Sequence, residues 1–331
     1  MKKILFIRHT PTQCPWYVEN HIEYIIRYLG NKYNFDLAMA SETINDGFHR
    51  NPNDYDLLVP LLTTHTHMEN PEKFYHKMAG IVYEPGEVGM IKGVCYASTN
   101  PITDQRLEEM KLPYVKTRFG IDTNLFRPYN LFKGDSDLIV GVVGKCHSPR
   151  KLFKDLVLPL AGLEGIKVKV YSQQPLPEKE LEYCGGEKFV ECLAGGNKSW
   201  IGMPNIYNSI DVLLETDCDL SVSFPTLEAA ACAAPVICTP GGLSGYLKDA
   251  GVAIELLPEG MDINDFRNWA YDNPKKLSDK IREAVIYLRD HPEKRKAMGR
   301  SGIQEVVLHW QWSWTISGWD EFLTKALELA K

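Results

Sequence analysis

The sequence lacks three features that would assign it to common classes of protein. It has no run of about 18 apolar residues, the least that a membrane-spanning helix needs. Its eight cysteines include no C-x-x-C pair, which disfavours a structural zinc site and a thiol redox motif. Its formal net charge is −6, so there is no excess of cations for a nucleic-acid backbone. We therefore expect a cytoplasmic protein that neither spans a membrane nor binds nucleic acid.

The sequence does contain enough apolar residues for a large folded core. Of its 331 residues, 44% are hydrophobic and 11% are aromatic, values that are typical of globular proteins. Because one domain usually takes about 100–200 residues, this length predicts two domains.

Strand-like and helix-like segments alternate along the chain, which is typical of parallel α/β sheets. We predict that a first group of strands forms one Rossmann-like sheet, at residues 4–7, 35–39, 57–62, 80–83, 94–97 and 114–116. The rhythm then starts again, with predicted strands at residues 138–143, 166–171, 188–190, 211–214 and 236–239. The fold class is therefore α/β, with two Rossmann-like domains that face each other across a ligand-binding cleft. The predicted bounds are 1–128 for the first domain, 129–136 for a linker, 137–308 for the second domain and 309–331 for a C-terminal helix.

The segment at residues 223–242 carries the most information about chemistry. It predicts a loop, a helix, a strand and a turn, with Pro225 and Glu228 in the first helical turn and Pro235 at the helix end. The N-terminus of such a helix presents backbone N–H groups to a phosphate, and Glu228 could accept hydrogen bonds from a ribose diol. The alternative is that Glu228 only complements the helix dipole.

This segment resembles the donor site of retaining GT-B glycosyltransferases of the family 4 type, also called glycosyl transferases group 1. The family pattern is E-x7-E followed by A-x-A-C-G-x-P-V, and residues 227–237, LEAAACAAPVI, match its second half. The resemblance implies that Glu228 is the family's second glutamate, which holds the donor ribose. Leu220 stands where the family has its first glutamate, a contact of the transferred sugar, so the motif is degenerate. Asp217 and Asp219 lie nearby as candidate substitutes.

Other segments resemble the family in the same order along the chain. The resemblance implies that Gly144, Lys145 and Lys151 form the diphosphate site, and that Val190 and Glu191 lie beside the nucleobase. For the two lysines, a solvated basic loop is the alternative. Residues 118–128 resemble the end of the family's first domain. Residues 203–214 resemble the helix and strand that come before the donor loop. Residues 308–315 resemble the segment that leads to a last helix, which returns to the first domain.

The first domain is expected to hold the acceptor. The family often has a functional histidine at a strand end here, and the resemblance implies this role for His65 or His67, after the predicted strand at 57–62. His9, near the end of the first strand, is a third candidate, and Trp16 is expected on the same acceptor side. Histidines held by the backbone at a strand end are the alternative for each of them.

The resemblance as a whole implies a metal-independent glycosyltransferase that uses a nucleoside-diphosphate sugar, of the UDP or GDP type, and retains configuration. Lys145 and Lys151 would stabilise the departing diphosphate. No cofactor or metal ion is expected beyond this co-substrate. The expected donor-binding residues are Gly144, Lys145, Lys151, Val190, Glu191, Ser223, Phe224, Pro225, Thr226, Leu227 and Glu228.

The nature of the acceptor stays open at this point. It is expected to be a carbohydrate, a lipid-linked molecule or a small molecule, and the nearly neutral first domain does not indicate firm membrane attachment. Two alternatives to a transferase also remain. One is a catalytically impaired nucleotide-sugar-binding protein, and the other is a nucleotide-sugar epimerase of the same architecture.

Overall fold

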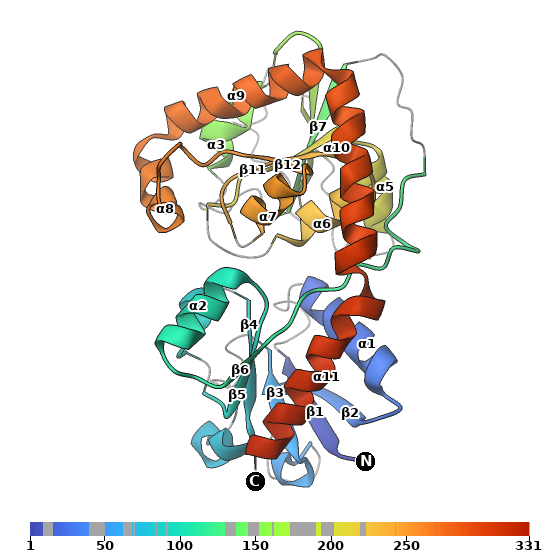
Figure 1. The fold of residues 1–331 in the computed structure, drawn as a ribbon, viewed down its shortest axis with the longest axis vertical. Coiled ribbons are helices and arrows are strands. Elements are labelled where there is room, and N and C mark those ends of the chain that lie inside the picture. Colours follow the sequence, from blue (N-terminus) through green and yellow to red (C-terminus); the bar gives the residue numbers. More distant parts are fainter. Residues whose placement is uncertain are drawn as a thin grey trace. The chain divides into compact units, whose positions relative to one another are not determined.

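The computed structural model divides into two compact units. The first comprises Met1–Gly120 together with Trp310–Lys331, and the second comprises Ile121–His309. Both units are α/β structures, drawn as ribbons in Figure 1. The described residues are 1–8, 16–39, 50–61, 68, 70–83, 85–90, 92–129, 137–144, 152–160, 162–172, 190–192, 202–218, 223–241 and 243–330.

The first unit is built on two parallel sheets of three strands each. In the order β2-β1-β3, one sheet contains β1 (Lys3–Arg8), β2 (Asn34–Met39) and β3 (Leu57–Pro60). In the order β4-β5-β6, the other contains β4 (Ala79–Val82), β5 (Cys95–Ser98) and β6 (Tyr114–Lys116).

All six predicted strands of this unit are therefore confirmed, but the prediction of a single sheet is wrong. An isolated bridge from Leu58 to Met78 stands where a ladder would join the two sheets. Pro60 ends β3, and because proline has no N–H group it cannot donate to a further ladder bond.

Four helices of the first unit begin with a proline. Three short 3₁₀ helices start on a proline, at Pro52–Asp54, Pro71–Lys77 and Pro85–Glu87. The α-helices are α1 (Trp16–Leu29) and α2 (Pro101–Glu109). Asn100 caps α2 by accepting hydrogen bonds from the backbone N–H groups of Ile102 and Thr103. Proline suits these positions because the first turn of a helix leaves its N–H groups unpaired.

The last helix, α11 (Trp312–Leu329), packs on the first unit, as the sequence predicts. The indole N–H of Trp319 donates to the carbonyl oxygen of Arg118 at 2.9 Å. Trp312 lies so close to Gly120 that a Cβ there would fall 2.2 Å from the indole ring. Glycine is therefore required at position 120 by the close approach of the helix.

The second unit is built on a six-stranded parallel sheet, in the order β12-β11-β10-β7-β8-β9. Four of its strands confirm predictions, and β9 lies two residues later than the strand predicted at 188–190. The sequence pattern does not predict the sixth strand, β12. The bounds are β7 (Leu138–Gly144), β8 (Ile166–Ser172), β9 (Val190–Cys192), β10 (Val212–Glu215), β11 (Val236–Cys238) and β12 (Ala253–Glu255).

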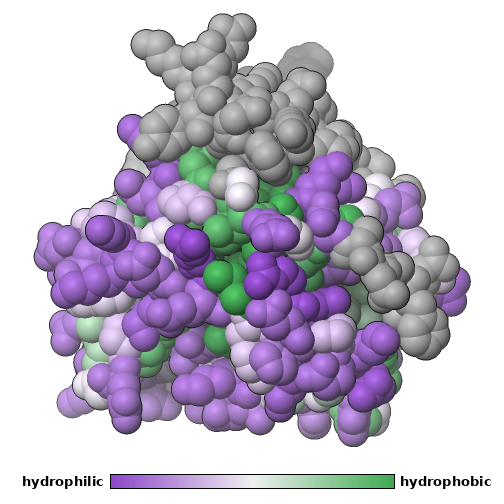
Figure 2. All heavy atoms as spheres, turned by 90° about the horizontal axis from the view of Figure 1, so that it is seen from above, coloured by the Kyte–Doolittle hydropathy of each residue, from purple (hydrophilic) through white to green (hydrophobic). Residues whose placement is uncertain are grey.

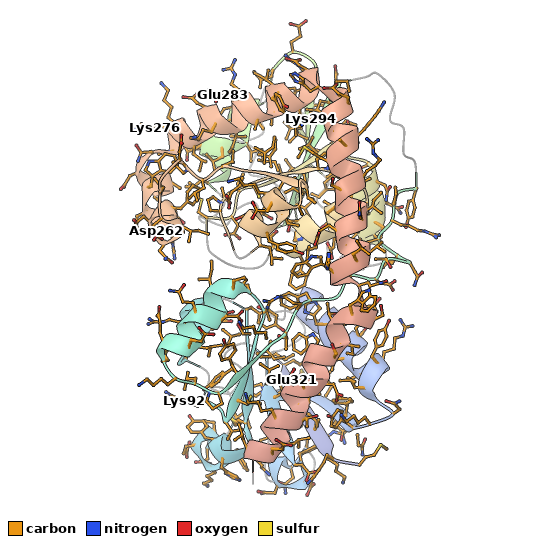
Figure 3. All side chains as sticks on the ribbon, in the orientation of Figure 1. Lys92, Asp262, Lys276, Glu283, Lys294 and Glu321 are labelled. Atoms are coloured by element: carbon orange, nitrogen blue, oxygen red, sulfur yellow. The ribbon has the colours of Figure 1, made fainter. Side chains whose placement is uncertain are left out.

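Helices and a buried core surround this sheet. Its apolar strand residues pack against α8 and α9 through Phe266, Ile281 and Val285, which are fully buried. Lys276 and Glu283 of α9, labelled in Figure 3, are exposed, and most coloured residues on the face drawn in Figure 2 are hydrophilic. The helix bounds are α3 (Phe153–Leu156), a 3₁₀ turn (Leu158–Leu160), α5 (Met203–Asn208), α6 (Phe224–Ala231), α7 (Ser244–Asp249), α8 (Ile263–Asp272), α9 (Pro274–Asp290), α10 (Pro292–Glu305) and a π-helical turn (Val306–Trp310).

Two glycines of α10 let this helix approach α6 closely. A Cβ at Gly299 would lie 2.5 Å from the carbonyl oxygen of Ala233, and one at Gly302 would lie 2.9 Å from that of Ala230. The small side chains in and after α6 therefore pack against glycines of α10. This packing fixes the position of α6 on the sheet.

The described residues contain neither a candidate membrane-spanning helix nor a candidate metal site. In these parts of the chain, no helix is long and apolar enough to cross a membrane. Nor does any group of three or more His, Cys, Asp or Glu within the described ranges have the arrangement to hold a metal ion.

Candidate functional site

A small pocket lies at the carboxyl ends of two neighbouring strands of the second unit, β10 and β11. The starts of α6 and α7 complete it, so that helix N-termini and strand ends meet in one place. In parallel α/β sheets this edge is where ligands bind. Its lining residues are Glu215, Asp217, Ser223, Thr226, Cys238, Thr239, Gly241, Leu243, Ser244 and Leu247.

The helix α6 begins without a side-chain cap. Ser223 occupies the N-cap position with an extended backbone, φ −91° and ψ 105°, but its hydroxyl does not bond to the helix. That hydroxyl donates instead to Oε2 of Glu215 at 2.8 Å. Serine normally caps a helix by accepting hydrogen bonds from its first amides, and the hydroxyl of Ser223 does not have this role here.

Two buried carboxylates lie at the strand ends beside the pocket. Glu215, which is 5% exposed, accepts from Ser223 and also from the backbone N–H of Asp217 at 3.0 Å. At the end of β12, Glu255 accepts from the hydroxyl of Ser244 at 2.5 Å and pairs with Lys248 at 3.6 Å. Each carboxylate is thus paired with a serine at the start of a helix.

Cys238 lies between these carboxylates, at the end of β11. Burial, together with the charges of Glu255 and Glu215, raises the pKa of its thiol. The sulfur therefore stays protonated at neutral pH and is no nucleophile there. The polar groups of the pocket that remain for a ligand are hydroxyls, backbone groups and carboxylates.

Glu228 lies deeper in the structure than the sequence suggests. It is the fifth residue of α6, so the prediction that it lies in the first turn is wrong, and it is only 3% exposed. The helix also ends at Ala231, four residues before Pro235. A carboxyl group that is buried in the second turn is not a simple surface partner of the helix dipole.

A tyrosine from α5 engages the carboxyl group of Glu228. The hydroxyl of Tyr207 donates to Oε2 of Glu228 at 2.6 Å, and Tyr207 is itself fully buried. Burial raises the pKa of Glu228 to about 8, although the hydrogen bond from Tyr207 works in the opposite direction. Burial and the carboxylate raise the pKa of Tyr207 well above its usual value, so the phenol remains the donor.

The structure describes part of the predicted donor site. Residues Ser223 to Glu228 lie together at the start of α6: Ser223, Phe224, Pro225, Thr226, Leu227 and Glu228. Gly144 ends β7 with a left-handed φ of 117°, on the strand next to β10. Val190 and Glu191 open β9, at the far edge of the same sheet, where the backbone alone is described.

The other predicted residues are not placed. Trp16 begins α1, with only its backbone described. Seven predicted or candidate positions lie outside the described residues: His9, His65, His67, Lys145, Lys151, Asp219 and Leu220.

Sequence reasoning missed three residues of this site. Tyr207 stands in the segment 203–214, which resembles the family, but a contact across 21 residues has no local signal. Glu215 and Glu255 do have one, since each is an acidic residue that ends a strand whose other residues are apolar. In a parallel sheet, that pattern marks the edge where ligands bind.

The sequence model of a family described as glycosyl transferase-like matches residues 150–320, which is just over half of the chain. No curated protein sequence matches the chain significantly.

Several solved structures resemble the whole chain. HepE of Anabaena in complex with UDP and glucose is 11% identical with a TM-score of 0.73, covering 98% of this chain and 100% of its own. Sucrose-phosphate synthase of Thermosynechococcus elongatus is 13% identical with a TM-score of 0.73 and 100% coverage of both chains. WaaG, a glycosyltransferase involved in lipopolysaccharide biosynthesis, is 12% identical with a TM-score of 0.62, covering 96% and 99%. The predicted α/β fold of the GT-B type is confirmed.

Proposed function

The chain belongs to the glycosyl transferase-like family, and we propose that it moves a sugar from a nucleoside-diphosphate sugar to an acceptor with retention of configuration, as the family 4 type does. One observation carries this proposal. The segment Ser223–Glu228 lies at the carboxyl edge of the parallel sheet, at the start of α6 and in the lining of the pocket. The N-terminus of a helix favours an anion such as a diphosphate.

The proposed donor is a UDP or GDP sugar. Glu228 accepts from the ribose hydroxyls, and the residues before it offer backbone N–H groups to the phosphates. The similar HepE protein has been solved with UDP and with UDP-glucose, which supports this class of donor. Lys145 and Lys151 follow Gly144 in the chain. We propose that these two lysines stabilise the negative charge of the leaving diphosphate. On this proposal the reaction needs neither a metal ion nor a cofactor.

The proposed acceptor site belongs to the first unit. One of His9, His65 and His67 steadies the acceptor hydroxyl, with Trp16 beside it. The acceptor is a carbohydrate, a lipid-linked molecule or a small molecule, and the reaction serves carbohydrate biosynthesis in the cytoplasm.

Calorimetric titration with UDP, GDP, ADP and CMP tests the donor site without knowledge of the acceptor. We expect one nucleoside diphosphate to bind preferentially. In Glu228→Ala its affinity should fall by about 1–3 kcal/mol, because charge-assisted hydrogen bonds to the ribose are lost. The matched control is Tyr33→Phe, which removes a hydroxyl bonded to Asp320 at 2.8 Å in the first unit and should leave the affinity unchanged. Absence of binding at millimolar concentration, or unchanged affinity in a folded Glu228→Ala protein, would contradict the proposal.

A second candidate is a protein that binds nucleotide sugars without transferring them. The observation that favours it is Leu220, which replaces the glutamate that contacts the sugar in the family pattern. Release of UDP from UDP-glucose, or of GDP from GDP-mannose, would distinguish the two. A protein that binds the donor but never releases diphosphate from it is the binding protein.

A further inference from the structure

Tyr207 and Glu228 form a closed pair inside the second unit. The phenol donates to Oε2 of the carboxyl group at 2.6 Å, and the two residues are 0% and 3% exposed. They come from different helices, α5 and α6, so the bond fixes one helix against the other. A buried carboxyl group that accepts from a fixed donor has one orientation, since rotation would break the bond without solvent to replace it.

The residues that follow the first unit hold Tyr207 in place. Phe126 is buried and packs against the phenol ring with 6.1 Å between the centroids. Next to Tyr207, the side-chain amide of Asn208 donates to the carbonyl oxygen of Arg127 at 3.0 Å and accepts from the backbone N–H of Tyr129 at 2.8 Å. The helix α5 is thus held to the segment 126–129 at Tyr207 and at the residue that follows it.

We propose that Tyr207 is a positioning residue, which holds Oε2 of Glu228 so that Oε1 is presented to the ribose hydroxyls of the donor. This inference rests on the proposed function of Glu228. Tyr207 itself does not touch the nucleotide. Its role is to hold the carboxyl group of Glu228 in one orientation before the ligand binds. This preorganisation lowers the entropy cost of binding.

The titratable groups around the pair give the proposal a pH signature. Besides Glu228, the groups that face Tyr207 are Cys232, at the end of α6, and Glu215, at the end of β10. Of the groups that act on Glu228, the phenol is the one that lowers its pKa. Removal of the hydroxyl therefore raises that pKa further, and the ionised form that accepts from ribose is reached only at higher pH.

The test compares two ligands in the Tyr207→Phe protein: the better-binding of UDP and GDP, and its 2′,3′-dideoxy form. Affinities are measured by calorimetry between pH 6 and pH 9. We expect Tyr207→Phe to weaken the ribonucleotide by about tenfold and to leave the dideoxy nucleotide within twofold of the wild type. The pH midpoint of ribonucleotide binding should move upward in the variant. Equal losses for both ligands, or an unchanged midpoint, would overturn the assignment and indicate a purely structural role.

A matched control separates this effect from general destabilisation. Tyr171→Phe removes another tyrosine hydroxyl of the same unit, which lies 2.6 Å from Oγ of Ser209. It should leave the ratio of the two affinities unchanged. In a Glu228→Gln background, Tyr207→Phe should have no additional effect on the ribonucleotide, and a full additional loss there would also overturn the assignment.

A further variant covers the case in which Tyr207→Phe does not fold. Phe126→Leu keeps the hydroxyl but loosens the packing of its ring, and it should weaken the ribonucleotide by about threefold without affecting the dideoxy form. Equal affinity of Phe126→Leu and wild type for the ribonucleotide would count against the proposal. If the wild type bound neither UDP nor GDP, the donor site itself would fail, and this outcome is distinct from a wild type that binds both ligands with no effect of Tyr207.

Discussion

The two units bury different polar side chains at the carboxyl ends of their parallel strands. Around the end of β5, in the first unit, most of the buried polar residues are neutral: Ser98, Thr99, Asn100, Thr103 and Thr117, with Asp104 as the one buried carboxylate among the described residues there. At the ends of β10 and β12 and in α6, in the second unit, the buried polar groups include three carboxyl groups, those of Glu215, Glu228 and Glu255. The second edge therefore buries more groups that cost much free energy to desolvate.

The edge of the first unit at the end of β5, here called the neutral edge, has polar side chains that bond mostly to one another and to the backbone. Ser98 and Thr103 bond through their hydroxyls at 2.6 Å, and Thr117 and Thr99 donate to backbone carbonyl oxygens. Asp104, a buried carboxylate of α2, lies within 3.5–3.7 Å of two cations, Arg118 and Lys116. These bonds use most of the polar groups of this edge, while Oδ1 of Asp104 has no hydrogen-bond partner among the described residues. We interpret this edge as a structural network.

The charged edge is of a different kind. Its carboxyl groups accept from serine and tyrosine hydroxyls, which neutralise no charge, and Glu255 also pairs with Lys248 at 3.6 Å. Several buried carboxyl groups in one place are typical of functional sites. We therefore interpret this edge, rather than the edge of the first unit, as the ligand site.

The largest expected effect concerns pH. Because the pKa of Glu228 rises from 4.5 when unfolded to about 8 when folded, the folded protein binds more protons between these values. The free energy of unfolding should therefore fall as pH rises from 5 to 8, by a contribution on the order of 4 kcal/mol. Glu228→Gln removes that contribution, so its urea denaturation should depend less steeply on pH. The same slope in the variant and the wild type would show that another group is responsible.

The next effect tests the neutral edge. Asn100 accepts from two amides of α2 and donates to the carbonyl oxygen of Tyr83 at 3.2 Å. Asn100→Ala loses the helix cap and leaves buried groups unpaired, so stability should fall by about 3 kcal/mol in chemical denaturation. Nucleotide affinity of the folded fraction should stay the same. A loss of affinity without a loss of stability would reverse our interpretation of the two edges.

The smallest effect concerns the serine that bonds to Glu215. Ser223→Ala removes one donor from a buried carboxylate and should cost about 1–2 kcal/mol of stability. The control is Ser317→Ala, an exposed serine whose hydroxyl donates to the carbonyl oxygen of Trp314, with an expected change below about 0.5 kcal/mol. Thermal unfolding of both variants gives the comparison. Equal stability of the two variants would mean that the hydrogen bond from Ser223 to Glu215 does not stabilise the fold.

The sequence predicts those parts of the fold and the site that depend on local patterns. Apolar runs locate ten of the strands, and Pro225 correctly marks the start of α6. The strand β12 is not predicted, and the break between β3 and β4 depends on pairing between distant segments. The bond from Tyr207 to Glu228 and the diversion of Ser223 to Glu215 arise only when different elements pack together. Residue types indicate what a site can do, whereas their partners come from tertiary structure.

The most direct measurement is a crystal structure of the protein with the nucleoside diphosphate that binds best. The account predicts a ribose hydroxyl within hydrogen-bond distance of Glu228 and phosphate oxygens at the start of α6, beside Ser223. Electron density for the nucleotide at the neutral edge of the first unit, or a ribose that does not contact Glu228, would contradict the account.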